Sequence, residues 1–369
     1  MFFRGFRGHI ICLYQVEPVP ALSVSGRHLA LLLPGLCGPV SDPPVTDYLV
    51  PRPVALDRLL SRSRVQPAGG MDLDSTLCHW FGLEDGQHSS LPLAPLTYLS
   101  DAGEQSPGYL LRADPVHLRA DQSSLRLFDS HGFSVTQEEA AELVAAFNEF
   151  YAERGWRLTA PRPQRWYLSL PADPGITTTP IGKVAGQVVD PCLPQGDAAA
   201  DWHALLNEIQ MLFHAHPVNS AREQRGEPAI NSLWFWGGGV LPATLLTRAA
   251  RVATDHPLGM GLAQQAGIAR VDVPEDVDAL LAQTDDGLSL LVNDLLDGPT
   301  RYGDIENWVA ALQQLEQHWF SPLLAAIKKG EVSSLEIYPC NGHSYMTNKR
   351  QQRRFWKRSR PFEAVCKHG

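Results

Sequence analysis

Short apolar runs alternate with helical patterns along much of this chain. Four of these runs end abruptly in polar or glycine-rich turns: Leu29 to Leu33, Leu233 to Trp236, Ser289 to Val292 and Leu335 to Tyr338. Runs of this length that are apolar throughout are typical of strands buried on both faces. Because helical patterns separate them, we predict an α/β fold in which the four strands share one doubly wound, mainly parallel sheet. Ligands bind beyond the carboxyl ends of such strands.

Two helices are clear from the spacing of apolar residues. One begins at Asp304, whose carboxylate suits an N-cap, and Pro322 is expected to kink or split it. The other, Gln137 to Glu153, lies between predicted strands at 125–128 and 166–170. This β-α-β segment indicates a second, smaller domain.

Clusters of proline bracket the later part of that segment and indicate a domain boundary. We predict a discontinuous core domain made of residues 27–112 and 229–369. The smaller α+β domain, residues 113–228, is inserted into it and is expected to contact the substrate. Residues 1–26 form an N-terminal extension.

The composition is that of an ordinary globular protein, with 44% hydrophobic and 19% charged residues in 369. A net charge of -9 argues against nucleic acid as the partner of the chain as a whole. The six cysteines include no C-x-x-C pair, which favours free thiols in a reducing compartment. No signal-peptide cleavage site follows the N-terminal apolar run, and no stretch is long enough to span a bilayer. We expect a soluble, cytoplasmic protein that does not bind membranes.

The C-terminal tail departs from this charge balance. Residues 349–369 carry eight basic residues against one acidic residue, Glu363, with Phe355 and Trp356 between them. Cations interleaved with aromatic side chains are typical of surfaces that bind nucleic acid. A protein or nucleic-acid partner for this tail is one hypothesis, and a solvated charged segment is the other.

One motif is specific enough to indicate a family. The segment 216–222 reads H-P-V-N-S-A-R, Pro228 to Asn231 follows, and Leu233 to Gly239 reads L-W-F-W-G-G-G. This pattern resembles the signature of archaeal-type cofactor-independent phosphoglycerate mutases, which belong to the alkaline phosphatase superfamily. Weaker parallels at Leu111 to Asp114 and Asp74 to Gly82 extend the resemblance over about residues 27–362. Its closest form resembles bacterial RpfE-type regulatory proteins.

The resemblance implies two divalent metals held by Asp and His, and a serine nucleophile that receives the phosphoryl group. Most of these positions differ here. The resemblance places seven metal-ligand and nucleophile positions in this chain. Five of them carry residues that cannot act as ligand or nucleophile: Pro34, Leu73, Arg301, Gly342 and Lys357. The residual catalytic candidates are Ser75, which a shift of register would place at the nucleophile position, with Asp297 and His343. We therefore expect no metal and no other cofactor, and the alternative is a pair of manganese or zinc ions.

The arginine-bearing motifs persist although the metal ligands do not. An arginine offers a planar fork that matches phosphate or carboxylate. The expected ligand-binding residues are Arg112, Asp114, His216, Asn219, Arg222, Arg301 and Lys357. The competing interpretation of the 216–222 motif is a helix C-terminus with its histidine bonded to backbone and Arg222 on the surface. The glycine run 237–239 is interpreted as structural first.

These observations support a phosphoglycerate-mutase-like protein with a degenerate metal and nucleophile site. Its expected role is regulatory or ligand-sensing, through a small phosphorylated or carboxylated metabolite bound between the two domains. The alternative is an active metal-dependent phosphoglycerate mutase or phosphatase. A third hypothesis is an interaction module built on the basic tail.

Overall fold

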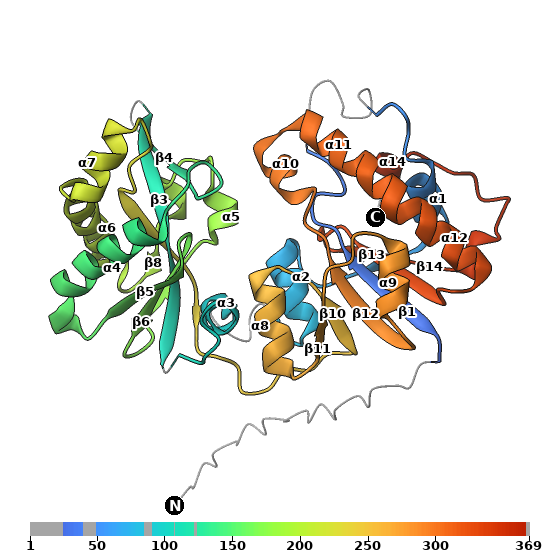
Figure 1. The fold of residues 1–369 in the computed structure, drawn as a ribbon, viewed down its shortest axis with the longest axis horizontal. Coiled ribbons are helices and arrows are strands. Elements are labelled where there is room, and N and C mark those ends of the chain that lie inside the picture. Colours follow the sequence, from blue (N-terminus) through green and yellow to red (C-terminus); the bar gives the residue numbers. More distant parts are fainter. Residues whose placement is uncertain (1–24, 40–48, 85–90, 107, 122–123, 367–369) are drawn as a thin grey trace, which may run out of the picture.

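The structure is a computed structural model that describes residues 25–39, 49–84, 91–106, 108–121 and 124–366. Two groups of elements, each built around its own sheet, lie side by side (Figure 1). The N-terminal extension predicted at 1–26 lies outside the described residues except for its last two. No described helix is long and apolar enough to cross a membrane.

The first sheet has seven strands in the order β11-β10-β12-β1-β13-β14-β2. Their bounds are β1 Arg27–Leu32, β2 Arg64–Pro67, β10 Arg251–Ala253, β11 Ala269–Val271, β12 Gly287–Val292, β13 Ser334–Tyr338 and β14 His343–Asn348. The pairs from β11 to β13 are parallel, and β14 runs antiparallel to both its neighbours. The predicted α/β class with a mainly parallel central sheet is confirmed, and three of the four predicted strands, β1, β12 and β13, lie in that sheet.

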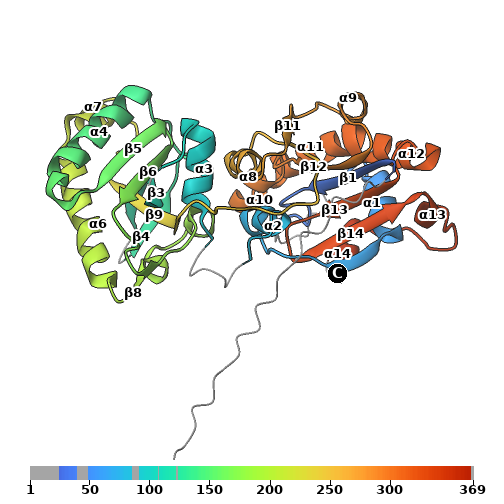
Figure 2. The same ribbon diagram turned by 90° about the horizontal axis from the view of Figure 1, so that it is seen from below.

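Helices cover both faces of this sheet (Figure 2). They are α1 Val54–Arg62, α2 Leu73–Trp80, α8 Pro257–Ala266, α9 Val277–Gln283, α10 Asp297–Tyr302, α11 Ile305–Leu315, α12 Ser321–Lys329, α13 Lys349–Gln352 and α14 Phe362–Cys366. Alternate side chains of β1 enter different cores, because successive residues of a strand point to opposite faces. Leu29 and Leu31 pack with α1, α11 and α12, whereas Ala30 and Leu32 pack with α2 and α8.

The helix predicted from Asp304 is present. The Asp304 side chain accepts a hydrogen bond from the backbone N–H of Asn307, as an N-cap does. The helix then widens into a π-helical segment at Glu316–Phe320 before α12 begins. Pro322 follows this segment directly in α12, and His318, four residues before the proline, lies within the segment, so the interruption falls where the missing N–H of Pro322 is expected to disturb the helix.

The second sheet contains β4, β3, β6 and β5 in that order, with β9 paired to β3. The bounds are β3 Tyr109–Asp121, β4 Ser124–Phe128, β5 Arg157–Arg162, β6 Arg165–Leu170 and β9 Ser232–Gly239, and β7 Ile176–Thr177 pairs with β8 Gln195–Gly196. The associated helices are α3 Leu93–Ala102, α4 Gln137–Phe150, α5 Ile181–Val184, α6 Ala199–His214 and α7 Pro217–Gln224, with short 3-10 turns at Ala152–Arg154 and Asp190–Cys192. The predicted β4-α4-β6 segment is part of this sheet.

The expectation that the strand at 233–236 belongs to the parallel sheet is wrong. β9 pairs antiparallel with β3, from Ser232 opposite Val116 to Gly239 opposite Leu110. Its side chains are buried on both faces, between α6 on one side and α3 on the other, which explains the continuous apolar pattern. The second sheet therefore draws strand residues from both sides of the boundaries predicted at 112 and 228.

Helices α3 and α8 join the two groups of elements (Figure 1). Their backbones approach so closely that a Cβ added at Gly261 would lie 1.8 Å from the carbonyl oxygen of Leu96. Only glycine fits at this crossing. The contact holds the two sheets in a defined relation.

Candidate functional site

A cavity of about 360 Å³ lies between the two sheets. From the first sheet it receives Asp74, His256 and Arg301, each of which follows the carboxyl end of a strand, namely β2, β10 and β12. From the second sheet and α3 it receives Thr97, Arg112, Asp114, Asp129, His131, Arg165 and Trp236. The prediction of a site beyond the carboxyl ends of the parallel strands agrees with this position.

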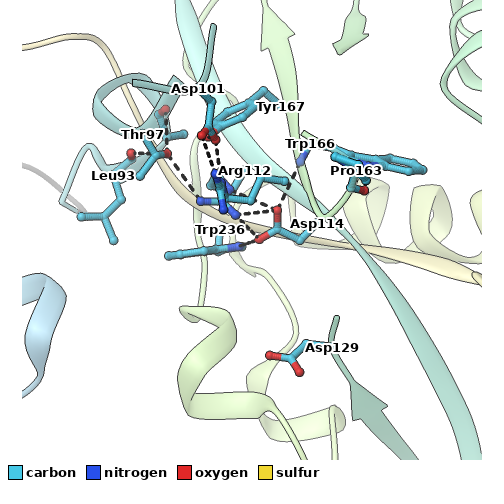
Figure 3. Close-up of polar contacts among 12 residues, drawn as sticks. Leu93, Thr97, Asp101, Arg112, Asp114, Asp129, Pro163, Trp166, Tyr167 and Trp236 are labelled. Atoms are coloured by element: carbon cyan, nitrogen blue, oxygen red, sulfur yellow. Dashed lines mark hydrogen bonds and ion pairs between the residues drawn. The ribbon is translucent and has the colours of Figure 1, made fainter. Parts of the chain in front are cut away.

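Arg112 and Asp114 form a buried pair on β3. The guanidinium donates from Nε at 3.1 Å and from Nη2 at 2.8 Å and 2.9 Å to the Asp114 carboxylate (Figure 3). Burial opposes the charge on Arg112, but the adjacent Asp114 carboxylate raises the pKa of the guanidinium. The carboxylate also accepts from Trp236 Nε1 at 2.8 Å and from the backbone N–H of Trp166 at 3.3 Å.

The Arg112 guanidinium is enclosed as well as paired. Its centre lies 5.2 Å from the ring of Tyr167 and 4.9 Å from that of Trp236. Its Nη1 approaches Thr97 Oγ1 at 3.5 Å. Because Nε and Nη2 are bonded to Asp114 and Nη1 approaches Thr97, we assign Arg112 to the cavity wall rather than to a free anion-binding fork.

Arg165 begins β6 and pairs with the carboxylate of Asp101. Its Nε and Nη2 donate to Asp101 at 2.7 Å and 2.6 Å, and Tyr167 donates to the same carboxylate at 2.6 Å. Although burial favours the neutral acid, these bonds lower the pKa of Asp101. The Nη1 of Arg165 is not used by this pair, and Arg165 lines the cavity.

A third group joins the two sheets. The carboxylate of Asp129 accepts from His131 Nδ1 at 2.9 Å and from the Tyr302 hydroxyl, on α10, at 2.9 Å. The hydrogen bond with Asp129 raises the pKa of His131. Burial alone would raise the pKa of Asp129, but the bonds from His131 and Tyr302 lower it. The imidazole Nε2 remains available to a ligand.

Arg301 enters the cavity from α10. Its Nη2 lies 2.5 Å from the Asp297 carboxylate, one helical turn earlier. The guanidinium also approaches α5 closely, since a Cβ added at Gly182 would lie 3.1 Å from Arg301 Nη1. Its side chain is 38% exposed, so part of the cationic fork faces the cavity.

Asp74 and His256 line the remaining part of the cavity. Burial raises the pKa of the Asp74 carboxyl, and the nearby His256 opposes that shift. The Nδ1 of His256 is buried without a hydrogen-bond partner, although a ligand or water is normally expected at such an atom. These two side chains offer an acceptor and a polar ring to a molecule in the cavity.

The prediction that the 216–222 motif faces this cleft is wrong. Arg222 is 1% exposed, and its donors reach Glu139 at 2.7 Å, the carbonyl of Ser134 at 3.0 Å and the carbonyl of Pro228 at 2.8 Å. Asn219 bonds to the backbone of Phe213 and Ile230. These side chains fix the segment before β9, and none of them lines the cavity.

The remaining residue of this motif, His216, is the N-cap of α7. Its Nδ1 accepts from the backbone N–H of Val218 at 3.3 Å. The competing interpretation agrees only in the bond between the histidine and the backbone, because the helix end is the N-terminus and Arg222 is buried, not on the surface. The glycine run is structural in the same way, because a Cβ added at Gly239 would lie 2.6 Å from Pro92.

Three other candidates lie away from the cavity lining. Ser75 completes a capping box at the start of α2, with its hydroxyl 2.5 Å from the Asp72 carboxylate. His343 begins β14, and Lys357 Nζ lies 3.5 Å from the carbonyl of Ser63. None of the three side chains is among the residues that line the cavity, and the roles expected for them stay predictions.

The side chains near this cavity do not suit a pair of divalent ions. Zinc and manganese sites need three or more donors around each ion. Within the described ranges, no three His, Cys, Asp or Glu side chains are grouped in this way. Asp297 occupies one of the metal-ligand positions that the resemblance leaves unchanged, and it pairs with the guanidinium of Arg301. The expectation of no metal stays a prediction.

Sequence reasoning missed several polar residues that line the cavity, among them Asp129, His131, Arg165 and His256. The Asp129-Ser130-His131 turn after a predicted strand was a usable signal, because polar residues at a strand end are typical of sites. Arg165 and His256 carry no motif, and only their contacts identify them. Of the predicted ligand-binding residues, the cavity contains Arg112, Asp114 and Arg301.

Known proteins resemble this chain at moderate distance. No family model matches it. It is 24% identical over 247 residues to a probable 2,3-bisphosphoglycerate-independent phosphoglycerate mutase of Geobacter sulfurreducens, a match that covers 59% of each chain. The corresponding mutase of Methanosarcina acetivorans is 24% identical over 241 residues, covering 59% of this chain and 61% of the relative. The chain thus matches about three fifths of the length of these relatives.

A solved structure shows the same fold. The PH0037 protein from Pyrococcus horikoshii superposes with a TM-score of 0.51 at 16% identity, covering 88% of both chains. The resemblance to cofactor-independent phosphoglycerate mutases inferred from the motifs is confirmed by the curated relatives. The closer resemblance to RpfE-type regulatory proteins stays a prediction.

Proposed function

We propose that this chain is a phosphoglycerate-mutase-like protein that binds a small phosphorylated or carboxylated metabolite between its two sheets, with a regulatory or ligand-sensing role. The observation that carries the proposal is the convergence of His131, Arg165 and Arg301 on one cavity from both sheets. Each has a nitrogen that takes no part in the pairing with its neighbouring carboxylate, which is Asp129, Asp101 or Asp297 respectively. Positive groups with unused donors recognise anionic oxygens.

The same arrangement explains a sensing role. His131 and Arg165 come from the second sheet, whereas Arg301 comes from α10 of the first. An anion that bonds all three would add contacts across the cleft to those that Tyr302 makes with Asp129 and Lys183 makes with Asp72. Ligand binding would then stabilise one arrangement of the two sheets over others.

Replacement of Arg301 by glutamine is expected to weaken binding of 3-phosphoglycerate or a related acid by about ten- to a hundredfold. A charge-assisted hydrogen bond contributes roughly 1.5–3 kcal/mol, which corresponds to that range. Isothermal calorimetry in the presence of chelator measures the effect, because binding in this proposal does not require metal.

Two variants control this measurement. Arg301→Gln combined with Asp297→Asn separates the loss of the donor from the repulsion of the carboxylate that is left behind. Arg248→Gln removes an exposed ion pair with Glu336 outside the cavity and should leave affinity unchanged. Equal affinity in Arg301→Gln and in the parent chain, or no binding of any phosphorylated or carboxylated compound, contradicts the proposal.

Affinity for the anion is expected to fall as pH rises through the pKa of His131. The cationic imidazole attracts the ligand, and its pKa is raised by Asp129, so the loss occurs above the ordinary histidine range. Calorimetry across this range should show the dependence in the parent chain and not in His131→Gln. His256→Gln tests the other cavity histidine, and a pH dependence that persists in His131→Gln but not in His256→Gln would assign the effect to His256.

The alternative function is an active metal-dependent mutase or phosphatase, and the names of the curated relatives favour it. Assays of phosphoglycerate mutase and phosphomonoesterase activity with added manganese or zinc, together with elemental analysis, separate the two. Turnover with two metals per chain would establish the alternative. Metal-independent ligand binding without turnover would support the sensing function.

A further inference from the structure

In residues 349–366, the described part of the predicted basic tail, the two ends are helical and the middle is exposed. Residues 349–352 form α13 and residues 362–366 form α14. Between them, residues 353–360 are exposed at every position and read R-R-F-W-K-R-S-R. This segment, the basic-aromatic loop, contains five cations and no acidic residue. Phe355 is 83% exposed and Trp356 is 70% exposed.

The loop is held to α1 at both ends. Arg62 Nη1 donates to the carbonyl of Gln352 at 2.6 Å before the loop begins. At its end, the backbone N–H and carbonyl of Arg360 bond to Ser61 Oγ at 2.8 Å and 3.1 Å. The buried Phe362 follows, with its N–H bonded to Asp57. These anchors keep the two aromatic side chains outside the core, although their burial would be favourable.

The surrounding surface adds to the positive charge. Helices α1, α12 and α13 contact one another at this end of the first sheet (Figure 2). Lys349 on α13 donates to the carbonyl of Lys329 at 3.1 Å, which places the end of α12 beside it. Burial and the neighbouring Arg58 lower the pKa of Lys328, which shows how closely the cations are gathered. The loop is therefore the outer part of a larger basic surface.

We propose that the basic-aromatic loop is a binding site for single-stranded nucleic acid. Four of its five cations are arginines, whose planar forks match phosphodiester oxygens. The rings of Phe355 and Trp356 meet edge to face at 5.3 Å, which leaves ring faces open for bases to stack on. The loop has no aliphatic side chain, and this favours stacking over insertion into a bilayer. The remainder of the chain is acidic, so contact is confined to this surface.

Fluorescence anisotropy of a labelled oligothymidylate with the full chain tests the proposal. Single-strand affinity falls with a slope of about 0.7 per phosphate neutralised, so five contacts predict a loss of about a hundredfold between roughly 50 mM and 200 mM salt. Trp356→Ala is expected to weaken binding by about five- to a hundredfold, since stacking on one ring is lost. Phe150→Ala, which removes an aromatic ring that is 59% exposed elsewhere, is the matched control.

Charge is tested separately. Arg354→Gln with Arg358→Gln should lower the salt slope by about 1.4, whereas Arg157→Gln with Arg270→Gln, two exposed arginines elsewhere, should not change it. All these side chains are exposed, and circular dichroism verifies that the variants fold. Equal binding by loop and control variants overturns the proposal. Binding to phosphatidylserine vesicles without binding to the oligonucleotide also overturns it and identifies a membrane surface instead.

Discussion

Replacement of Asp114 by alanine is expected to lower the free energy of unfolding by about 3–5 kcal/mol, because it leaves a buried guanidinium without its counter-ion. The pair side chains are only 7% and 6% exposed. Trp236 Nε1 and the N–H of Trp166 lose their acceptor at the same time. Urea denaturation of parent and variant measures the difference.

Asp121→Ala is the matched control for this prediction. Asp121 lies on the same strand and pairs with Arg126 at 2.7 Å, but both side chains are 40% or more exposed. Exposed pairs contribute at most about 1 kcal/mol, so its removal should have little effect. Similar losses in the two variants would show that burial of the Arg112–Asp114 pair is not what stabilises this region.

Replacement of Arg222 by alanine is expected to cost about 3–5 kcal/mol of stability and to leave ligand affinity unchanged. The side chain is fully enclosed, and its loss removes one of the donors to Glu139 and leaves the backbone carbonyls of Ser134 and Pro228 without this donor. Urea denaturation measures the first effect, and calorimetry with 3-phosphoglycerate on the folded variant measures the second.

Arg225→Ala is the control for Arg222→Ala, because it tests whether the loss of stability comes from burial of the arginine or from its charge alone. Arg225 reaches the same Glu139 carboxylate at 2.6 Å, but its side chain is 47% exposed. Solvent replaces its hydrogen bonds, and we expect little change in stability. A large loss of ligand affinity in Arg222→Ala would instead return this arginine to the binding site.

The local pattern of the sequence was sufficient for several elements. Strands β1, β12 and β13 follow from apolar runs with turn residues at their ends, and α11 follows from Asp304 and its apolar face. Such features depend on neighbouring residues only, because strand burial and helix capping are decided within a few positions. The motif resemblance likewise identified the fold.

Tertiary structure decided where those elements and side chains lie. An apolar run shows that a strand is buried on both faces but does not identify its partner, and β9 pairs with β3 instead of the parallel sheet. The role of Arg222 depends on Glu139, 83 residues away, and that of His131 on Tyr302 from the other sheet. Whether an arginine binds a ligand or stabilises the core depends on which carboxylate the fold places beside it. That contact cannot be predicted from the spacing of residues in the sequence.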